Sequence, residues 1–230
     1  PRKFYLQYVR KLKKKPSIHL IRGLIIHKTI ERFFNEEIAK ATCAHYNEIR
    51  NRILSIFKEE WTDKKATFHN LKLKDQDLEF LYSDSSKMII NWLHDYLRSK
   101  ILQSQEPECE KTLFSRKWMV MGRIDAIYSG RDPPLMIDYK TCKSLELTDD
   151  YKRQLGIYAL LYEEKHGIRP VTGIHYVKFQ NGLRIYKIRD TFLDNLKKTI
   201  KDIHQKTKSI NEKDYPCTCN GWCRNEFTSN

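Results

Sequence analysis

The chain has 230 residues, 40% of them apolar, which is enough to bury the core of one domain, or of one domain with an insertion, without disulfides. No run approaches the roughly 20 apolar residues of a membrane span, and the first residues lack the apolar stretch of a signal peptide, so a soluble cytoplasmic protein is expected. The 43 Lys and Arg outnumber the 29 Asp and Glu, and the formal charge of +14 favours a polyanionic partner, although ribosomal and membrane-surface proteins share this composition.

The first part of the chain is expected to be helical. Residues 1–17 alternate aromatic and basic side chains and end in a lysine run, which suits either a solvated helix face or a contact with phosphate groups. Residues 18–40 carry apolar side chains at helical spacing and predict one long helix. Residues 42–105 continue with amphipathic spacing and contain neither Pro nor Gly, which indicates a helical insertion or lid.

The pattern changes to strands at about residue 106. Strands are predicted on both sides of the Gly- and Pro-containing turn at 129–134, and a helix is predicted over 149–167. A hairpin with a tight Asn181-Gly182 turn and a last amphipathic helix follow. This order predicts an α/β fold: a small mixed central sheet flanked by helices, with a helical insertion and a cysteine-rich C-terminal tail.

Three charged residues, Asp125, Asp138 and Lys140, fall inside segments that otherwise read as buried strands. Because the side-chain period of a strand is two, Asp138 and Lys140 point to the same face. If Asp125 faces the same way across the hairpin, the two carboxylates repel each other unless a cation lies between them. Such oxygen ligands suit Mg²⁺ or Mn²⁺, with Lys140 beside an attacking water. The alternative is a structural Asp138–Lys140 ion pair, with Asp125 capping a turn.

Four short motifs follow one another along the chain. They are Gly23 to His27 in "GLIIH", Gly122 to Asp125 in "GRID", Asp138 to Lys140 in "DYK", and Gln154 to Tyr158 in "QLGIY". In this order they resemble the motifs of the RecB-like branch of the PD-(D/E)XK nuclease superfamily, and the resemblance spans residues 23–158. It implies a restriction-endonuclease-like core and a Mg²⁺- or Mn²⁺-dependent deoxyribonuclease that hydrolyses phosphodiester bonds.

The resemblance also implies which residues form the site. A lone His such as His27 on an apolar helix is ordinarily a core residue, but the matching family histidine is a metal ligand. Gln154 and Tyr158 lie one helical turn apart on one face; the alternative is a core Tyr158 and a surface Gln154. A glutamate before the first strand is sometimes part of related sites, and the sequence does not choose among Glu106, Glu108 and Glu110. The implied catalytic residues are Asp125, Asp138, Lys140, Gln154 and Tyr158, and the implied metal ligands are His27, Asp125, Asp138 and Tyr139.

Three cysteines, Cys217, Cys219 and Cys223, fall within seven positions near the C-terminus, and such clustering in a reducing compartment favours a metal. Three thiolates need a fourth ligand for Zn²⁺ or a [4Fe–4S] cluster. The tail, together with the opening "PRKFYLQYV", is similar to the CRISPR-associated RecB-like exonucleases, which implies an iron–sulfur cluster whose fourth cysteine directly precedes Pro1. The C-x-C-x-x-x-C spacing is tighter than usual in that group, so Zn²⁺ or a cluster-free tail stays open. So does a fourth ligand from Cys43, Cys109 or Cys142.

The predicted organisation is an N-terminal segment and first core helix (1–30), a helical insertion (31–105), a nuclease core (106–206) and a cysteine-rich metal- or cluster-binding tail (207–230). The predicted function is metal-dependent DNA cleavage, by resemblance as an exonuclease on single-stranded ends, in CRISPR adaptation or DNA repair and with CRISPR integration proteins as candidate partners. The insertion is expected to roof a channel lined by Lys11, Lys13, Lys14 and Lys15. The alternatives are a non-catalytic nucleic-acid-binding module and a structure-selective endonuclease on the same fold.

Overall fold

A computed structural model describes residues 1–36, 38, 45–71 and 73–227. The chain divides into two compact units, a larger one of residues Ile18–Leu196 and a smaller one that joins Pro1–Ser17 to Lys197–Asn230. The boundaries predicted from the sequence separate the first 30 residues from the cysteine-rich tail, so they do not coincide with this division. The two ends of the chain together form the smaller unit.

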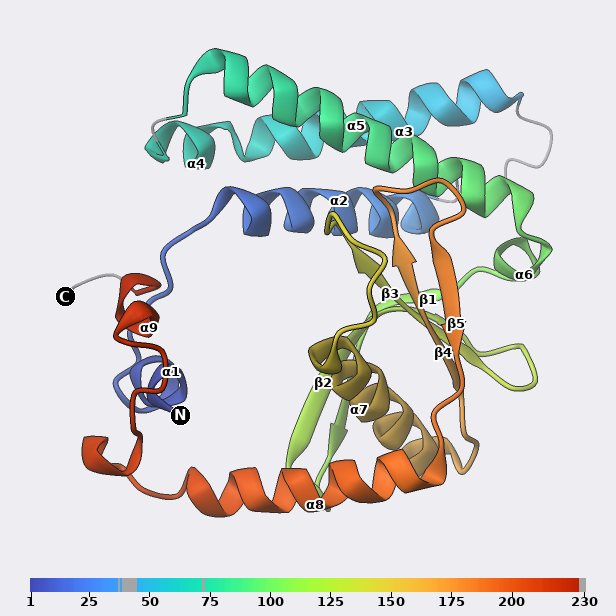
Figure 1. Ribbon diagram of the computed structural model, residues 1–230. Coiled ribbons are helices and arrows are strands. Elements are labelled where there is room, and N and C mark those ends of the chain that lie inside the picture. The colour runs from blue at the N-terminus through green and yellow to red at the C-terminus, as the bar shows by residue number, and fades with distance from the viewer. Residues whose placement is uncertain (37, 39–44, 72, 228–230) are drawn as a thin grey trace. The chain divides into compact units, whose positions relative to one another are not determined.

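The larger unit is built around a five-stranded mixed sheet with the strand order β1-β2-β3-β4-β5 (Figure 1). The pairs β1–β2, β2–β3 and β4–β5 are antiparallel, and β3–β4 is parallel. A parallel pair needs a crossover connection, which helix α7 (Asp149–His166) supplies. The predicted α/β class with a small mixed sheet is confirmed. The strands are β1 (Glu108–Ser115), β2 (Val120–Tyr128), β3 (Leu135–Lys140), β4 (Val171–Tyr176) and β5 (Leu183–Tyr186).

Helices cover both faces of the sheet. Leu135, Ile137 and Tyr139 of β3 pack into a core shared with α2, α3 and α5, whereas Met136 packs into a second core shared with α7. This alternation follows from the two-residue period of a strand, and it directs Asp138 to the α7 side with Met136. Figure 1 shows α3 and α5 stacked over α2. The helices of this layer are α2 (Ile18–Asn35), α3 (Tyr46–Asp63), α4 (Lys65–Asn70), α5 (Asp75–Arg98) and α6 (Lys100–Gln103).

Helix α7 has a defined start and end. The Thr148 hydroxyl accepts the N–H of Tyr151 at 3.3 Å and so caps the helix N-terminus. Gly167 ends the helix at a left-handed φ of 72°, a conformation that glycine adopts without strain. The helix therefore presents a fixed face, including Gln154 and Tyr158, to the sheet.

The β4–β5 hairpin is tied to α5 by a buried carboxylate. Asp95 accepts the N–H groups of Asn181 at 2.7 Å and Gly182 at 2.8 Å, and lies 2.9 Å from His175 Nε2. Burial works to raise the pKa of Asp95, but these hydrogen bonds outweigh it, and the pKa is lowered. A Cβ at Gly182 would lie 2.2 Å from the carbonyl oxygen of Tyr176, so the predicted Asn-Gly turn needs its glycine.

The smaller unit has a core of its own. Helix α1 (Arg2–Phe4) continues into the π-helical turn η1 (Tyr5–Val9), whose Tyr5 and Leu6 are buried with Tyr215, Cys223 and Phe227. A β-bridge pairs Lys14 with Phe227. The opening segment is therefore only in part a solvated face, because the small core covers two of its side chains. The C-terminal part of this unit contains the end of α8 (Asp190–Lys206), the 3₁₀ turn η3 (Glu212–Asp214) and α9 (Trp222–Asn225).

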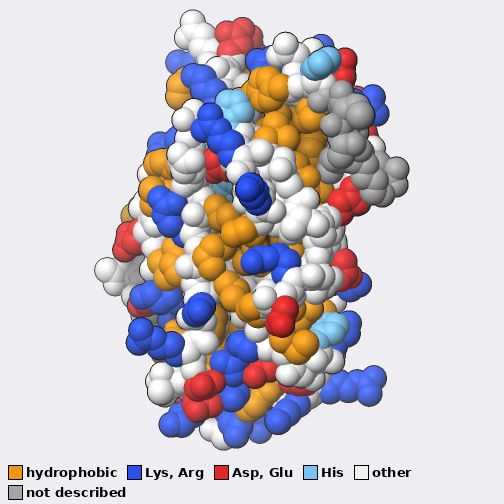
Figure 2. Space-filling model, turned by 90° about the vertical axis from the view of Figure 1, so that its right-hand side faces the viewer, with side chains coloured by type: hydrophobic (Ala, Val, Ile, Leu, Met, Phe, Trp, Pro, Cys, Tyr) orange, Lys and Arg blue, Asp and Glu red, His pale blue; other side chains and the backbone are white. Residues whose placement is uncertain are grey.

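The surface carries its basic charge in a dispersed form on the face that Figure 2 shows, where Lys and Arg side chains lie among apolar and acidic ones. Within the described ranges, no helix is both long and apolar enough to cross a membrane.

Candidate active site

A pocket of about 720 Å³ in the larger unit gathers side chains from α2, β2, β3 and α7. All five predicted catalytic residues line it, together with the predicted metal ligand His27. Residues of α3 to α6 that the structure describes line neither this pocket nor the one beside it, so the expectation that the insertion roofs the site finds no support there. The residues that carry the site are His27, Arg123, Asp125, Asp138, Lys140, Gln154 and Tyr158.

The first carboxylate, Asp125, lies inside β2, three residues before its end. The pairing of β2 with β3 stops at Ala126 and Ile137, and the Asp125 carboxylate then accepts the Tyr139 N–H at 2.7 Å in place of a backbone oxygen. Asp125 is 8% exposed. It does not cap a turn, so that part of the structural alternative is wrong.

The second carboxylate, Asp138 on β3, is only 2% exposed. Its Oδ1 accepts the Gln154 side-chain N–H at 2.8 Å and lies 3.1 Å from the Tyr158 hydroxyl. Its Oδ2 lies 2.6 Å from Lys140 Nζ but accepts no hydrogen bond of good geometry within the described residues. Burial and the charge of Asp125 raise the pKa of Asp138, against the lowering effect of Lys140. The positive charge of Lys140 therefore does not fully offset the effect of burial and of the Asp125 charge on the pKa of Asp138.

The Gln154 side chain connects the Asp138 carboxylate to the Lys140 ammonium. Its Oε1 accepts a hydrogen bond from Lys140 Nζ at 2.9 Å while its Nε2 donates to Asp138, which determines the orientation of the amide. The Lys140 ammonium also lies 4.8 Å from the centre of the Tyr151 ring. The predicted spacing of Gln154 and Tyr158 on one helix face brings both to Asp138. Lys140 is thus held in the pocket by three neighbours.

His27 projects from α2 toward the same carboxylates. Its Nε2 lies 3.0 Å from the carbonyl oxygen of Tyr139, which can only accept, so Nε2 carries a proton. Its Nδ1 lies 3.3 Å from Asp125 Oδ1. Burial works to lower the pKa of His27, but the hydrogen bond to Asp125 and the neighbouring acids outweigh it, and the pKa is raised. When the ring is neutral, two acceptors face each other, an arrangement that a bound cation would bridge.

Glu110 is a site residue that the sequence alone did not select. It lies within β1, not before it, at a φ of 51°, between the register pairs Cys109↔Ala126 and Lys111↔Ile124, and therefore opposite Asp125. Its Oε1 is 4.0 Å from His27 Nδ1, and its Oε2 is 2.8 Å from Arg123 Nε. Burial and the charge of Asp125 raise its pKa. The strand register would have distinguished it from Glu106 and Glu108.

The donor set fits a divalent cation. His27, Glu110 and Asp125 offer ligand atoms that all lie within 4.8 Å of one another. Asp138, another predicted ligand, lies outside this group of three and contributes the buried Oδ2. Tyr139 turns its ring into the core on the opposite face, so it can offer a metal only its carbonyl oxygen, which already faces His27. Oxygens with one imidazole nitrogen suit Mg²⁺ or Mn²⁺.

The glycines of the first two motifs have different physical roles. A Cβ at Gly122 would lie 3.1 Å from Leu161 Cδ1 and 3.2 Å from the Tyr158 ring, so the glycine lets α7 approach β2 closely. A Cβ at Gly23 would meet nothing nearer than the Thr141 hydroxyl at 3.9 Å. Gly23 lines the pocket, where a side chain would take up space.

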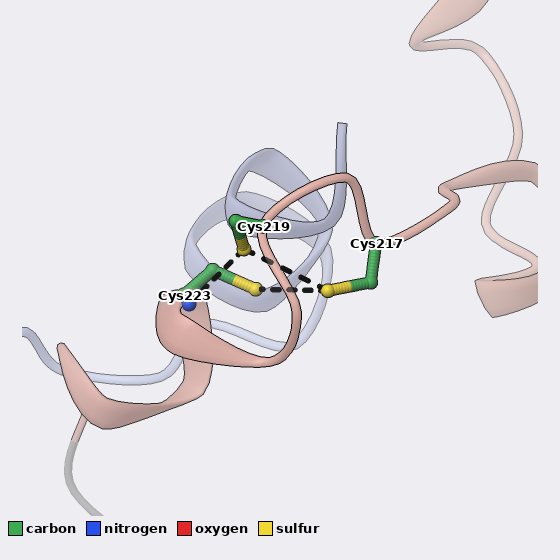
Figure 3. A group of neighbouring side chains, drawn as sticks. All are labelled: Cys217, Cys219 and Cys223. Atoms are coloured by element: carbon green, nitrogen blue, oxygen red, sulfur yellow. Dashed lines mark hydrogen bonds between the residues drawn. The ribbon is translucent and has the colours of Figure 1, made fainter.

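The smaller unit contains a second group of candidate metal ligands (Figure 3). Cys217 Sγ lies 3.6 Å from Cys219 Sγ and 3.9 Å from Cys223 Sγ, and the three sulfurs fall within 4.8 Å of one another. The N–H of Gly221 points to Cys217 Sγ at 3.2 Å, and the N–H of Cys223 points to Cys219 Sγ at 3.3 Å. Backbone N–H groups lower the pKa of Cys217 to about 7, whereas burial and the neighbouring thiols raise that of Cys223 to about 11. Three thiols with backbone donors fit a metal ion or cluster that needs one further ligand.

The other cysteines lie apart from this group in sequence. Cys109, on β1, is half buried, and burial raises its pKa to about 12. The Cys142 thiol donates to the carbonyl oxygen of Ser144 at 3.2 Å. Cys43 lies outside the described residues. A role for any of the three as fourth ligand stays a prediction.

Buried carboxylates with a lysine held beside them on an α/β sheet are typical of metal-assisted hydrolases. The sequence model of the PD-(D/E)XK nuclease superfamily matches residues 1–225, and the chain belongs to that superfamily. No curated protein sequence matches. Among solved structures, one described as a "Putative exonuclease" from Eubacterium rectale is similar, with a TM-score of 0.55 and 10% identity over 96% of this chain and 79% of that one. At that identity the likeness shows the fold.

Proposed function

We propose that the protein is a Mg²⁺- or Mn²⁺-dependent deoxyribonuclease that degrades DNA from single-stranded ends. The observation that carries the proposal is the convergence of His27, Asp125, Asp138, Lys140 and Gln154 in one pocket of a chain that belongs to a nuclease superfamily. Glu110 offers a further ligand atom within 4.8 Å of those of His27 and Asp125. The formal charge of +14 suits a polyanionic substrate.

Each residue of the pocket has a definable task. A divalent cation held by His27, Glu110, Asp125 and Asp138 would offset the charge of the phosphate and lower the pKa of a water molecule. Gln154 and Tyr158 keep the Asp138 carboxylate in place through hydrogen bonds. Lys140 directs its ammonium into the pocket, where it can stabilise charge that develops on the phosphate oxygens.

The exposed residues of the pocket lining are an argument for a single-stranded substrate. Three of its lining residues are apolar and well exposed: Leu20 by 53%, Leu24 by 48% and Met121 by 68%. Unpaired bases offer apolar faces to such side chains, whereas a duplex keeps its bases stacked inside. Arg123 and Arg153 line the same pocket and can contact the phosphate backbone of the DNA strand.

The three neighbouring thiols of Cys217, Cys219 and Cys223 are the basis for proposing a [4Fe–4S] cluster as a structural cofactor, with Zn²⁺ as the alternative. Pro1, Arg2 and Lys3 line the same small pocket as Cys219 and Cys223. The first residues of the sequence therefore lie beside two of the three cysteines, and the position of the fourth ligand stays a prediction. A visible absorption spectrum of freshly purified full-length protein distinguishes the cluster, which absorbs there, from colourless Zn²⁺. The setting, CRISPR adaptation with its integration proteins or DNA repair, stays a prediction from the resemblance.

The nuclease proposal is tested with labelled linear single-stranded, linear duplex and circular single-stranded DNA in Mn²⁺. We expect degradation of the linear single strand, and a rate loss of more than about a hundredfold for Asp138→Ala, since even indirect support of a metal site is worth 10- to 100-fold. Asp149→Ala is the control, because that exposed aspartate lines neither pocket and its one ion pair among the described residues is with Lys152 on the surface of α7. Full activity of Asp138→Ala would refute the assignment. Cutting of circles would favour an endonuclease, and binding without cleavage in any divalent cation would favour the non-catalytic module.

A further inference from the structure

A second pocket, of about 540 Å³, adjoins the active-site pocket. The two share three lining residues, His19, His27 and Lys140, so anything bound in one lies next to whatever is bound in the other. The second pocket lies at the end of β3, where the chain continues into residues 141–143. Its other lining residues are Arg22, Tyr139, Thr141, Cys142, Lys143 and Tyr151.

The two pockets differ in charge. The active-site pocket has three carboxylates in its wall, from Asp125, Asp138 and Asp150, alongside the cations Arg123, Lys140 and Arg153. The second pocket has no carboxylate among the described residues, and its wall includes the cations Arg22, Lys140 and Lys143. The first pocket therefore offers carboxylates to a bound cation, whereas the second suits an anion.

The cations of the second pocket fall into two kinds. The buried Arg22 is occupied: its Nη1 lies 3.1 Å from Asp84 Oδ2, and its Nη2 lies 3.4 Å from the Thr141 carbonyl oxygen, so it holds the end of β3. Lys143 is exposed and makes no ion pair or hydrogen bond within the described ranges. The exposed His19 ring and the Thr141 hydroxyl likewise have no partner in the described part of the chain. Three donor groups thus face the pocket without an acceptor.

We propose that the second pocket binds another phosphate group of the same nucleic-acid strand, next to the phosphate that is cut, through Lys143, His19 and the Thr141 hydroxyl. A strand whose reacting phosphate lies beside Lys140 must place the neighbouring nucleotide close to that lysine, and this pocket is the adjoining space. The Tyr151 ring, which lines the pocket and faces Lys140, offers a flat surface to the sugar or base. The bound phosphate is either an internal linkage or a terminal phosphate. This inference rests on the proposed function and assigns the residues that position the substrate.

Binding is measured separately from cleavage, by fluorescence anisotropy of a labelled single-stranded oligonucleotide with Ca²⁺ in place of Mn²⁺. We expect Lys143→Gln to weaken binding about tenfold, the worth of one hydrogen bond to a charged group. The slope of log affinity against log salt should fall by about 1. Lys187→Gln is the matched control, since it removes the same charge from an exposed lysine that lines neither pocket. Equal effects of the two substitutions would overturn the proposal.

Oligonucleotides with one uncharged methylphosphonate linkage, placed at each position in turn, then locate the contact. If an internal phosphate is bound, an uncharged linkage at one position weakens oligonucleotide binding by the wild type but does not further weaken binding by Lys143→Gln. If a terminal phosphate is bound, its removal has that effect instead. If Lys143→Gln responds to every uncharged linkage and to removal of the terminal phosphate just as the wild type does, the proposal is overturned. A protein that shows this dependence but does not cleave in Mn²⁺ would keep the phosphate site and lose the nuclease assignment, so the two failures are distinguishable.

Discussion

The two candidate metal sites of this protein are held in different ways. The carboxylate site is formed by neighbouring strands and two helices, and its side chains are oriented by hydrogen bonds such as those of Gln154. The cysteine site lies on α9 and the short segment before it, and its support is a core of five buried residues that includes Cys223 itself. A core this small supplies little stability by itself, and metals or disulfides commonly compensate in small units. We infer that the larger unit folds around its site without metal, whereas the smaller one depends on its metal.

The largest expected effect is therefore on the smaller unit. In full-length protein, Cys219→Ser should increase the rate of proteolytic cleavage within residues 1–17 and 207–227 by more than about a hundredfold, because loss of a structural metal removes folding free energy. Nuclease activity should fall less than that. Cys142→Ser changes a thiol outside the three-cysteine group and is the comparison: an unchanged cleavage rate is expected, and a similar increase would instead indicate Cys142 as the fourth ligand. Unchanged protease resistance of Cys219→Ser would show that the smaller unit does not depend on metal.

An intermediate effect is expected at Glu110. Glu110→Gln should lower the cleavage rate in Mn²⁺ by about 10- to 100-fold, the loss typical of disturbed metal sites. It should not lower the free energy of unfolding measured in urea, because it removes a half-buried charge that faces Asp125. Glu108→Gln, on the same strand but exposed and paired with Lys111, is expected to be neutral in both measurements. A Glu110 variant with normal activity would remove this residue from the metal site.

The smallest effects concern the two motif glycines, and they should differ in sign. Gly122→Ala should lower the free energy of unfolding by about 1–3 kcal/mol, since its Cβ would press on Tyr158 and Leu161. Gly23→Ala should raise it by up to about 1 kcal/mol, because alanine favours the helix and has space there. Urea unfolding of both variants measures the difference. If both variants are destabilised alike, close packing is not the reason for glycine at position 122.

Local patterns account for much of what could be predicted. The strand period placed Asp138 and Lys140 on one face, and the helix period placed Gln154 and Tyr158 together; the contacts among these four residues agree with both. The Asn181-Gly182 turn was equally visible, because its signal lies in two adjacent residues. The described residues of α3 to α6 line neither pocket, contrary to the expected roof, since helical periodicity shows that a segment has an apolar face but not which surface that face covers.

The sequence by itself determined the order of helices and strands, the acid and lysine on β3, and the cluster of three thiols, because each depends on residues within one turn or one strand. Only the tertiary structure decided that Glu110 lies opposite Asp125, that His27 meets a carbonyl oxygen 112 residues away in sequence, and that the chain ends share a core. It also decided that a pocket suited to an anion adjoins the active-site pocket. These features depend on strand register and on packing between distant segments, and neither leaves a periodic trace in the sequence.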